Sequence, residues 1–398
     1  MKSRQVIETK KGNQAMSHHN TVFSQLLKLL PRHEFEVLAK QHHSGRSFRT
    51  ASRWSQFVTM AMGQLAGRDS LRDIIDNMTA QAHRLYHLGC AKLSRSNLSR
   101  INEGKPHEFY EALFGKLLNR CRGLTPGHTF RFKNPLYSLD ASTIDLCLSV
   151  FPWADFRTTK GAVKLHVGLN HDGYLPEFVT ITEGKESDVT IGRLLEFPKG
   201  SIVAMDKGYN DYSWYKQLTD KEIFFVTRLK TNAKYRVISR RLVLKNKGLT
   251  SDQTIEFIGL QTAKKCPIPL RRIGYKDAVT GKHYIFLTNN FKLSAKTIAE
   301  IYKARWQVEL FFKWIKQNLK IKSFVGTSKN AVMTQIWIAL CVYLILSYLK
   351  FMFGLKKSMQ KIIRLLQMNL FEKRDFLALL RGEPIRDNEP NIKQLVLL

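Results

Sequence analysis

The stretch SIVAMD, residues 201–206, is a short apolar run that ends at an acid, Asp206. A run of this length that contains Ile and Val and is bounded by turn residues is typical of a buried β-strand. The segment YSLDAST, residues 137–143, has the same strand-like character and carries Asp140. The sequence therefore predicts two strands, each with a carboxylate at its end.

The segments around these strands predict a sheet that also includes helices. Two β-rich runs on either side of the turn at 170–173 predict a hairpin. Helical patterns at about 187–197 and 212–218 flank the strand at 201–206, and the run IFFVTRL at 223–229 predicts another strand. Strands and helices in this order predict a mixed α/β fold.

A long helix is predicted for residues 293–320, LSAKTIAEIYKARWQVELFFKWIKQNLK, with Ser294 as its N-cap. Four polar or charged residues are separated by three, four and seven positions, which places them on one face of the helix. They are Tyr302, Arg305, Glu309 and Lys316. Because apolar residues occupy other faces, this polar face is not simply the solvent side of the helix.

Glu309 is the only acid from Ile301 to Asn330, among seven Lys or Arg residues. Taken alone, a glutamate on a basic helix is usually part of a salt-bridged surface, and that interpretation stays open. A lone acid is also expected where a metal ion neutralises it. Glu309 is therefore a candidate to act together with Asp140 and Asp206.

The charge balance indicates a polyanionic partner. The chain has 64 Lys and Arg against 32 Asp and Glu, a net charge of +32 and a pI near 10.0. The excess is spread along the sequence, which suits several surfaces that neutralise nucleic-acid phosphates. A generically basic soluble protein remains an alternative, and an anionic membrane surface is a weaker one because no lipid-modification signal is present.

Three carboxylates that are distant in the sequence suit phosphodiester chemistry. Cutting or transferring a DNA strand requires an activated nucleophile and a stabilised leaving 3′-oxygen, and two hard cations roughly 4 Å apart provide both. Such cations prefer carboxylate oxygens. Asp140, Asp206 and Glu309 are therefore the candidate ligands, and the other residues on the helix face can hold phosphates and a displaced base.

Three features together resemble one known family. They are the spacing of the four residues on the helix face, the motif LDAST around Asp140 and the motif AMDKGY around Asp206. In these features the chain is similar to the insertion-sequence-four (IS-four) family of DDE transposases, which carries a Tyr-Arg-Glu-Lys signature. The likeness runs from about Leu136 to Leu349 and extends more loosely to the N-terminal region.

The resemblance implies a ribonuclease H-like catalytic core with a β-rich insertion between the second Asp and the Glu. It implies that Asp140, Asp206 and Glu309 are catalytic and bind Mg²⁺ in a two-metal site, with Mn²⁺ as a substitute. The residues that it assigns to DNA are Tyr302, Arg305 and Lys316. The implied partners are double-stranded DNA, both terminal inverted repeats and target DNA, and a second copy of the chain in a synaptic homodimer. The implied function is DNA transposition by strand cleavage and strand transfer.

Two more residues are candidates for DNA contact. The family usually has Arg after the second Asp, and this chain has Lys207, which keeps the charge but loses a bidentate grip. Trp306, next to Arg305, is the best candidate to stack on a base. Core packing is the alternative for Trp306.

Within the N-terminal part, Ser94–Glu103 combines a Ser cap with exposed Arg, Asn and Ser. These residues suit phosphate contacts, although a solvated surface helix fits equally well.

The patterns divide the chain into six segments. The segments are a flexible leader at 1–16, an N-terminal helical DNA-binding domain at 17–128, the first part of the catalytic core at 129–230, a β-rich basic insertion at 231–283, the second part of the core at 284–350 and a C-terminal helical region at 351–398.

Residues 330–349 contain no charge and are nearly long enough to span a bilayer. Polar residues within the run favour a buried helix instead, so no membrane association is expected. The five cysteines form no CxxC pair, and residues 1–16 are too polar for a signal peptide. A cytoplasmic protein is therefore expected.

Two other classes of function stay open at this point. One is a ribonuclease H-like nuclease or an inactive DNA-binding relative, against which the intact set of three acids argues. The other is a purely architectural nucleic-acid-binding protein, against which the lone Glu309 argues. Short inverted repeats around the gene, with a small target duplication outside them, would distinguish a transposase from both.

Overall fold

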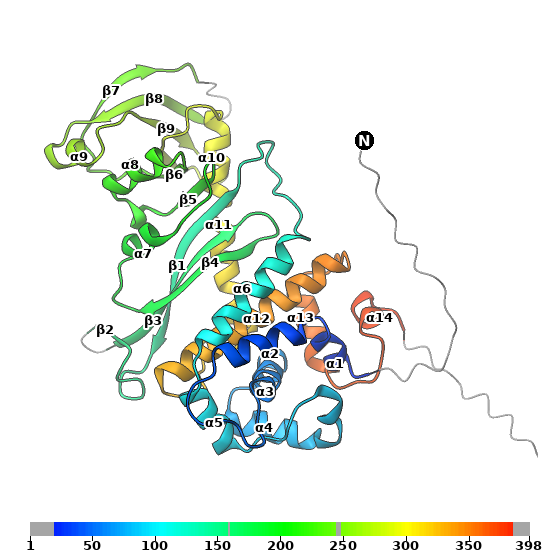
Figure 1. Cartoon of the computed structure of the whole chain (residues 1–398). Coiled ribbons are helices and arrows are strands. Elements are labelled where there is room, and N and C mark those ends of the chain that lie inside the picture. Colours follow the sequence, from blue (N-terminus) through cyan, green and yellow to red (C-terminus); the bar gives the residue numbers. More distant parts are fainter. Residues whose placement is uncertain (1–19, 158–159, 244–247, 385–398) are drawn as a thin grey trace, which may run out of the picture.

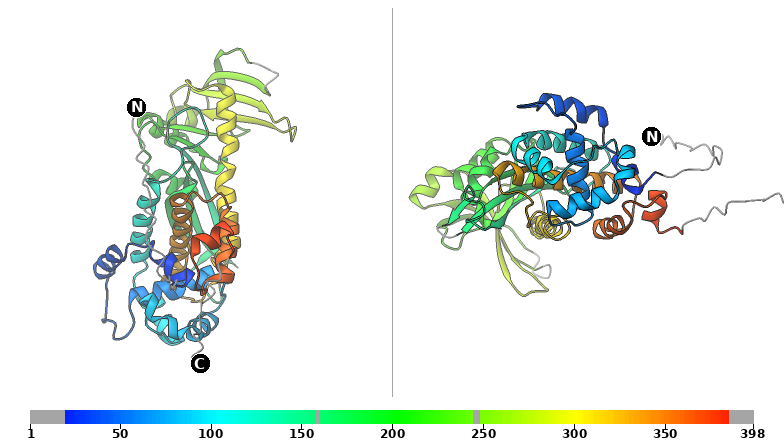
Figure 2. Two further views of the ribbon diagram at one scale, coloured as in Figure 1. Left: turned by 90° about the vertical axis from the view of Figure 1, so that its right-hand side faces the viewer. Right: turned by 90° about the horizontal axis from the view of Figure 1, so that it is seen from below.

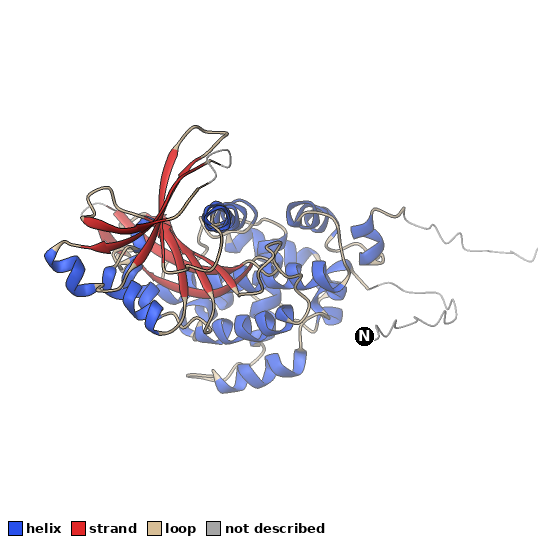
Figure 3. Ribbon diagram, turned by 90° about the horizontal axis from the view of Figure 1, so that it is seen from above, coloured by secondary structure: helices blue, strands red, loops and turns tan. Residues whose placement is uncertain are grey.

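The computed structural model describes residues 20–157, 160–243 and 248–384 (Figure 1). The predicted leader at 1–16 lies outside these residues. The molecule is elongated, with a twisted β-sheet toward one end and a body of helices toward the other (Figures 1 and 2). Figure 3 shows the strands fanning out beside this helical body.

The N-terminal part of the chain is helical, in agreement with its apolar periodicity. Ser52, Ser70 and Ser94 each precede a helix, and each side chain accepts a hydrogen bond from the backbone amide three residues on. This bond satisfies one of the free N–H groups at a helix start. The helices and short 3₁₀ turns are α1 (Val22–Leu27), α2 (Arg32–Gln41), α3 (Arg53–Leu65), α4 (Leu71–Ala80), η1 (Ala82–Arg84), η2 (Tyr86–Leu88), α5 (Arg95–Gly104) and α6 (Glu108–Arg122).

Helix α12, Lys329–Met352, corresponds to the uncharged run at 330–349. Among the described residues it is the one helix long and apolar enough to cross a membrane, yet 94% of its apolar window is buried inside the molecule. It packs against α3, α5 and α6, and its side chains share one hydrophobic core with theirs. The prediction of a buried helix is confirmed. Helices α13 (Met359–Asn369) and α14 (Phe376–Arg381) follow it.

The described residues form one ten-stranded sheet in the order β2-β3-β1-β5-β6-β10-β9-β8-β7, with β4 paired to β3. The pairs β1/β5 and β5/β6 are parallel and the others antiparallel. The β3/β4 pair is the predicted hairpin, and the mixed α/β class is confirmed. The strands are β1 (Leu136–Leu146), β2 (Asp155–Arg157), β3 (Lys160–Asn170), β4 (Leu175–Glu183), β5 (Ile202–Met205), β6 (Phe224–Arg228), β7 (Tyr235–Arg240), β8 (Leu249–Phe257), β9 (Leu270–Lys276) and β10 (His283–Thr288).

Helices cover both faces of this sheet. Successive residues of a strand point to opposite faces, so Tyr137 of β1 packs in the cluster that contains α8, and Leu136 packs in the cluster that contains α10. The sheet therefore has a buried face on each side. The elements concerned are α7 (Asp188–Leu194), η3 (Lys207–Tyr209), α8 (Tyr212–Asp220), α10 (Ala295–Ala304) and α11 (Trp306–Asn318).

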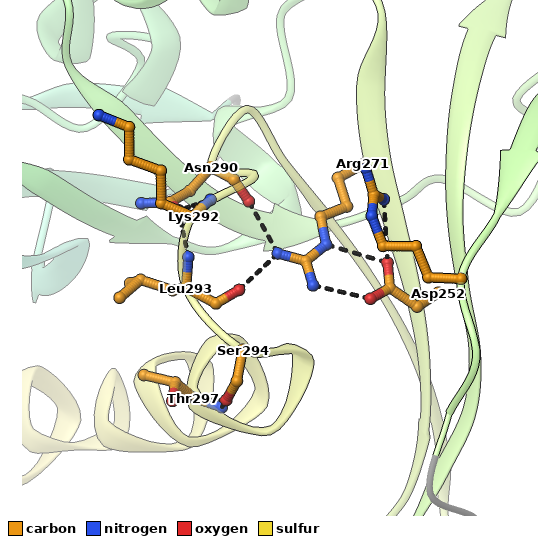
Figure 4. A network of polar contacts seen from close by, with 8 residues as sticks. Asp252, Arg271, Asn290, Lys292, Leu293, Ser294 and Thr297 are labelled. Atoms are coloured by element: carbon orange, nitrogen blue, oxygen red, sulfur yellow. Dashed lines mark hydrogen bonds and ion pairs between the residues drawn. The ribbon is translucent and has the colours of Figure 1, made fainter.

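The segment predicted as a basic insertion continues the sheet. Its strands β7, β8 and β9, with α9 (Leu260–Lys265) between β8 and β9, join through β10, which pairs with both β6 and β9. Arg271 of β9 donates to both carboxylate oxygens of Asp252 of β8, at 2.9 and 2.7 Å, and both side chains are buried. The same guanidinium donates to the carbonyl oxygens of Asn290 and Leu293, at 3.1 and 2.6 Å, in the loop that leads into α10 (Figure 4). The outer strands are thereby fastened to the start of α10.

The single helix expected over 293–320 is two helices, because the α-helical hydrogen-bond ladder is interrupted at Arg305. The first helix begins after the N-cap Ser294, as predicted. At the break, the N–H of Val308 donates to the carbonyl of Arg305 at 3.1 Å, a tighter three-residue spacing than in an α-helix. Helix α10 therefore ends, and α11 begins, on either side of Arg305.

Candidate catalytic site

Asp140 and Asp206 are neighbours because each follows the end of one parallel ladder. The last parallel pair between β1 and β5 is Leu139 with Met205, so the two acids are the next residues on their strands. β5 ends there, but β1 continues to Leu146 because the antiparallel β3 extends its pairing. Asp140 was expected at a strand end. That expectation is wrong for the strand as a whole, and Asp140 instead marks the end of its parallel half.

Glu309 reaches these acids from α11, which packs across β1 and β3. The guanidinium of Arg305 donates from Nη1 to Asp140 Oδ2 at 2.9 Å and from Nη2 to Glu309 Oε1 at 2.6 Å. One largely buried arginine, with an 11% exposed side chain, therefore connects an acid of the sheet with an acid of the helix. The fold brings the three predicted acids to one place.

The remaining residues of the predicted helix face also point at the sheet. The hydroxyl of Tyr302 donates to Asp206 Oδ1 at 3.3 Å. Lys316, farther along α11, donates from Nζ to the carbonyl oxygen of Thr143 at 2.7 Å. All four residues of the face thus lie along β1 or at the end of β5, and Lys316 lies some distance from the acids.

The two aspartates differ in their electrostatic surroundings. Burial raises the pKa of Asp140 to about 6, although Arg305 acts in the opposite direction, and the nearby charges of Glu309 and Asp206 add to the rise. Burial also acts to raise the pKa of Asp206, but the backbone amide of Lys207 and the charge of Arg305 outweigh it, so this pKa is lowered. At Asp140 the effect of burial therefore outweighs the ion pair with Arg305, whereas at Asp206 the backbone amide and the arginine charges outweigh burial.

Sequence reasoning missed Arg228, which belongs to the site. It stands at the end of β6, and its Nη2 lies 3.1 Å from Asp206 Oδ1. Its guanidinium also lies 5.8 Å from the centre of the Tyr302 ring. The sequence could have predicted this contact, because β6 is the next strand parallel to β5 and its last residue, Arg228, is level with Asp206.

The two additional DNA candidates are both accessible. Lys207 lies in η3 directly after Asp206, and its side chain is exposed. Trp306, the first residue of α11, is 57% exposed. Core packing was the alternative for Trp306, and this exposure excludes it.

The donor chemistry of the site fits a divalent cation, because hard cations take carboxylate oxygens. Within residues 20–157, 160–243 and 248–384, however, no three Asp, Glu, His or Cys side chains are close enough to hold one ion. In this structure the guanidinium of Arg305 bonds one oxygen of Asp140 and one oxygen of Glu309.

A basic α/β protein with three acids beside a sheet is the kind of protein that handles nucleic acid, and a comparison with known families identifies the family. A family model described as "Transposase DDE domain" matches residues 131–345, more than half of the 398-residue chain, including all three acids. The chain belongs to this family, and its class is that of the DDE-domain transposases. A second model, a domain of unknown function, matches residues 18–91 over the N-terminal helices.

Individual relatives are also transposases by name. The chain is 35% identical over 237 residues to "Putative transposase y4zB" of Sinorhizobium fredii, covering 58% of this chain and 66% of that protein. It is 27% identical over 339 residues to "Probable transposase for insertion sequence element IS5377" of Geobacillus stearothermophilus, covering 84% and 86%. It is 27% identical over 226 residues to "Putative transposase for insertion sequence element IS4SA" of Synechocystis sp., covering 56% and 64%. The first and third alignments thus span slightly less than two thirds of the relative.

A solved piggyBac transposase synaptic complex with hairpin DNA aligns with 94% of this chain and 81% of its own, at a TM-score of 0.45 and 13% identity.

Proposed function

We propose that this chain cuts DNA at the ends of a mobile insertion sequence and transfers the freed strand to target DNA. The observation that carries the proposal is the meeting of Asp140, Asp206 and Glu309, which come from two strands and a helix, beside Arg305 and Tyr302. Three acids gathered on a basic protein suit metal-assisted phosphoryl transfer. A structural ion pair with Arg305 would need only one acid.

The three acids are the proposed ligands of Mg²⁺ in a two-metal site, with Mn²⁺ as a substitute. When bound, the cations supply activation of the nucleophile and stabilisation of the leaving 3′-oxygen. The protein orients Asp206 through the hydroxyl of Tyr302 and the guanidinium of Arg228. Partial burial of Asp140, whose side chain is 21% exposed, lowers the local dielectric and would strengthen its interaction with a cation.

Positively charged and aromatic side chains around the acids are proposed to hold the DNA. Arg305 and Lys316 would contact phosphates, since charge-assisted hydrogen bonds to phosphate oxygens are among the strongest available. Lys207 is exposed beside the site and would do the same. Tyr302 and Trp306 would support a displaced base, Trp306 with the larger free face.

The N-terminal helices are proposed to bind the element ends. A groove of about 680 Å³ lies where α4 and α5 begin, and its lining includes Arg72, Arg95 and Arg100. In the described part of the chain none of these arginines has an ion-pair partner, and Arg100 bonds only the carbonyl of Ser96. Unpaired guanidinium groups beside a groove suit a phosphate backbone.

The finer classification and the boundaries are proposals of the same kind. The Tyr302-to-Lys316 spacing supports membership of the IS-four family, and the strand order around β1 and β5 supports a ribonuclease H-like core. The proposed segments are the N-terminal DNA-binding domain at 17–128, the core at 129–230 and 284–350, the insertion at 231–283 and the C-terminal region at 351–398. A homodimer holding two element ends in a synaptic complex is the proposed working form.

The test compares purified Glu309→Gln with the unchanged protein on labelled DNA from the gene's own flanks, in the presence of Mg²⁺. The substitution removes one ligand charge, so strand cleavage should be lost while DNA binding is nearly unchanged. Glu300→Gln is the matched control, because Glu300 is half exposed on α10 and, among the described residues, its one ion pair is with Lys296. Cleavage by Glu309→Gln at the unchanged rate would remove the basis of the proposal, and cleavage without strand transfer by the unchanged protein would favour a nuclease.

A further inference from the structure

Arg305 occupies an unusual position for a residue expected to hold DNA. Its side chain is only 11% exposed, and its guanidinium bonds Asp140 and Glu309, at 2.9 and 2.6 Å. Its Nε is buried and has no hydrogen-bond partner in the described part of the chain. The two ends of the guanidinium fork are thus committed to the proposed metal ligands and not directed at solvent, where DNA would arrive.

A guanidinium and a divalent cation compete for the same oxygens. Arg305 occupies one lone pair on one oxygen of each carboxylate and places a positive charge between the two acids, so it opposes a cation at the same position. Consistent with this, no three acidic, His or Cys side chains among the described residues are placed to share an ion. The charges agree as well, since the single positive charge of Arg305 offsets part of the negative charge of two partly buried carboxylates.

We infer that Arg305 is a stand-in for the cation, and that metal binding and DNA binding are coupled through its movement. This inference rests on the proposed function of the site. A metal that takes Asp140 and Glu309 releases a buried arginine with no acid to pair with, and a DNA phosphate is the anion that can receive it. Conversely, a phosphate that draws Arg305 away frees both carboxylates, and linkage requires that each ligand strengthen the other by the same factor.

The backbone at this residue permits such a movement. Arg305 lies between α10 and α11, where the regular ladder is interrupted, and not in the middle of one rigid helix. Tyr302 and Arg228 hold Asp206 independently of it. Withdrawal of the Arg305 side chain therefore leaves the third acid in place.

The experiment measures binding of Ca²⁺ alone by isothermal titration calorimetry, since Ca²⁺ takes the same oxygen donors as Mg²⁺. Without DNA, Arg305→Gln should bind Ca²⁺ about tenfold more tightly than the unchanged protein, because the competitor is gone. The control Lys313→Gln removes an equal charge from an exposed position on the same helix and should change the affinity less than about twofold. Equal or weaker Ca²⁺ binding by Arg305→Gln, or an equal gain in Lys313→Gln, would overturn the inference.

The second arm adds a duplex of the gene's flanking DNA. The unchanged protein should gain at least about fivefold in Ca²⁺ affinity, the lower range of known couplings, whereas Arg305→Gln should gain much less. An equal gain in both proteins contradicts the coupling. If instead Asp206→Asn and Glu309→Gln bind Ca²⁺ as well as the unchanged protein, the three acids are not the metal site, and the proposed function fails together with the inference.

Discussion

Replacing Arg271 should lower the free energy of unfolding strongly, because this residue forms a buried ion pair. Arg271 and Asp252 are 4% and 5% exposed, and the guanidinium also donates to two backbone carbonyls (Figure 4). In Arg271→Met, Arg241 is the one ion-pair partner that Asp252 keeps in the described part of the chain, at 3.5 Å and on a 40% exposed side chain. Breaking a buried pair from one side costs about 3–5 kcal/mol, because a charge is left buried without compensation.

The measurement is the free energy of unfolding in urea, followed by tryptophan fluorescence. The control is Arg236→Met, which breaks an ion pair with Glu256 between the neighbouring strands β7 and β8. Arg236 is 71% exposed, so this change should cost no more than about 1 kcal/mol. Adding Asp252→Leu to Arg271→Met should restore at least half of the lost stability, since it removes the uncompensated charge. A loss below about 1 kcal/mol in Arg271→Met, or none beyond the control, would refute the reasoning.

Three further predictions concern pH, salt and strand transfer. Burial, with the nearby charge of another histidine, lowers the pKa of His171 to about 4. In the unfolded chain the His pKa is near 6.5, so between pH 6.5 and 4 the unfolded state binds more protons than the folded state, and the free energy of unfolding should fall by roughly 3 kcal/mol as the pH drops through this range. The urea midpoint of His171→Gln should fall less over the same range. An identical pH profile in the variant and the unchanged protein would contradict the prediction. Replacing Arg72, Arg95 and Arg100 with Gln should reduce the slope of log binding constant against log salt by up to about 2.7 if all three meet phosphates, and an unaltered slope excludes that groove. Lys316→Ala should leave the first cleavage intact and lower strand transfer by about tenfold in a gel assay of joined products. Undiminished transfer would show that Lys316 acts only through its hydrogen bond to Thr143 of β1.

Local patterns in the sequence were sufficient for the positions of the acids and of the helix face. SIVAMD ends at Asp206 because an apolar run can stay buried only until the first charge, and β5 indeed ends at Met205. The spacing from Tyr302 to Lys316 placed four side chains on one face because helical geometry repeats every 3.6 residues whatever the surroundings. These features depend on neighbours in the chain, so they can be read without a partner.

The contacts that connect these elements depended on the tertiary structure. The pairing of β1 with β3 carries the strand past Asp140, and the pairing of β10 with β9 makes the basic segment part of the same sheet. The helix also breaks at Arg305, and the guanidinium of this residue connects Asp140 with Glu309, which are far apart in the chain. Periodicity and composition determined which residues could do chemistry. Which of them neutralise one another was decided only when strand pairing and helix packing set their distances, because electrostatic and hydrogen-bond energies depend on separation in space and not on order in the sequence.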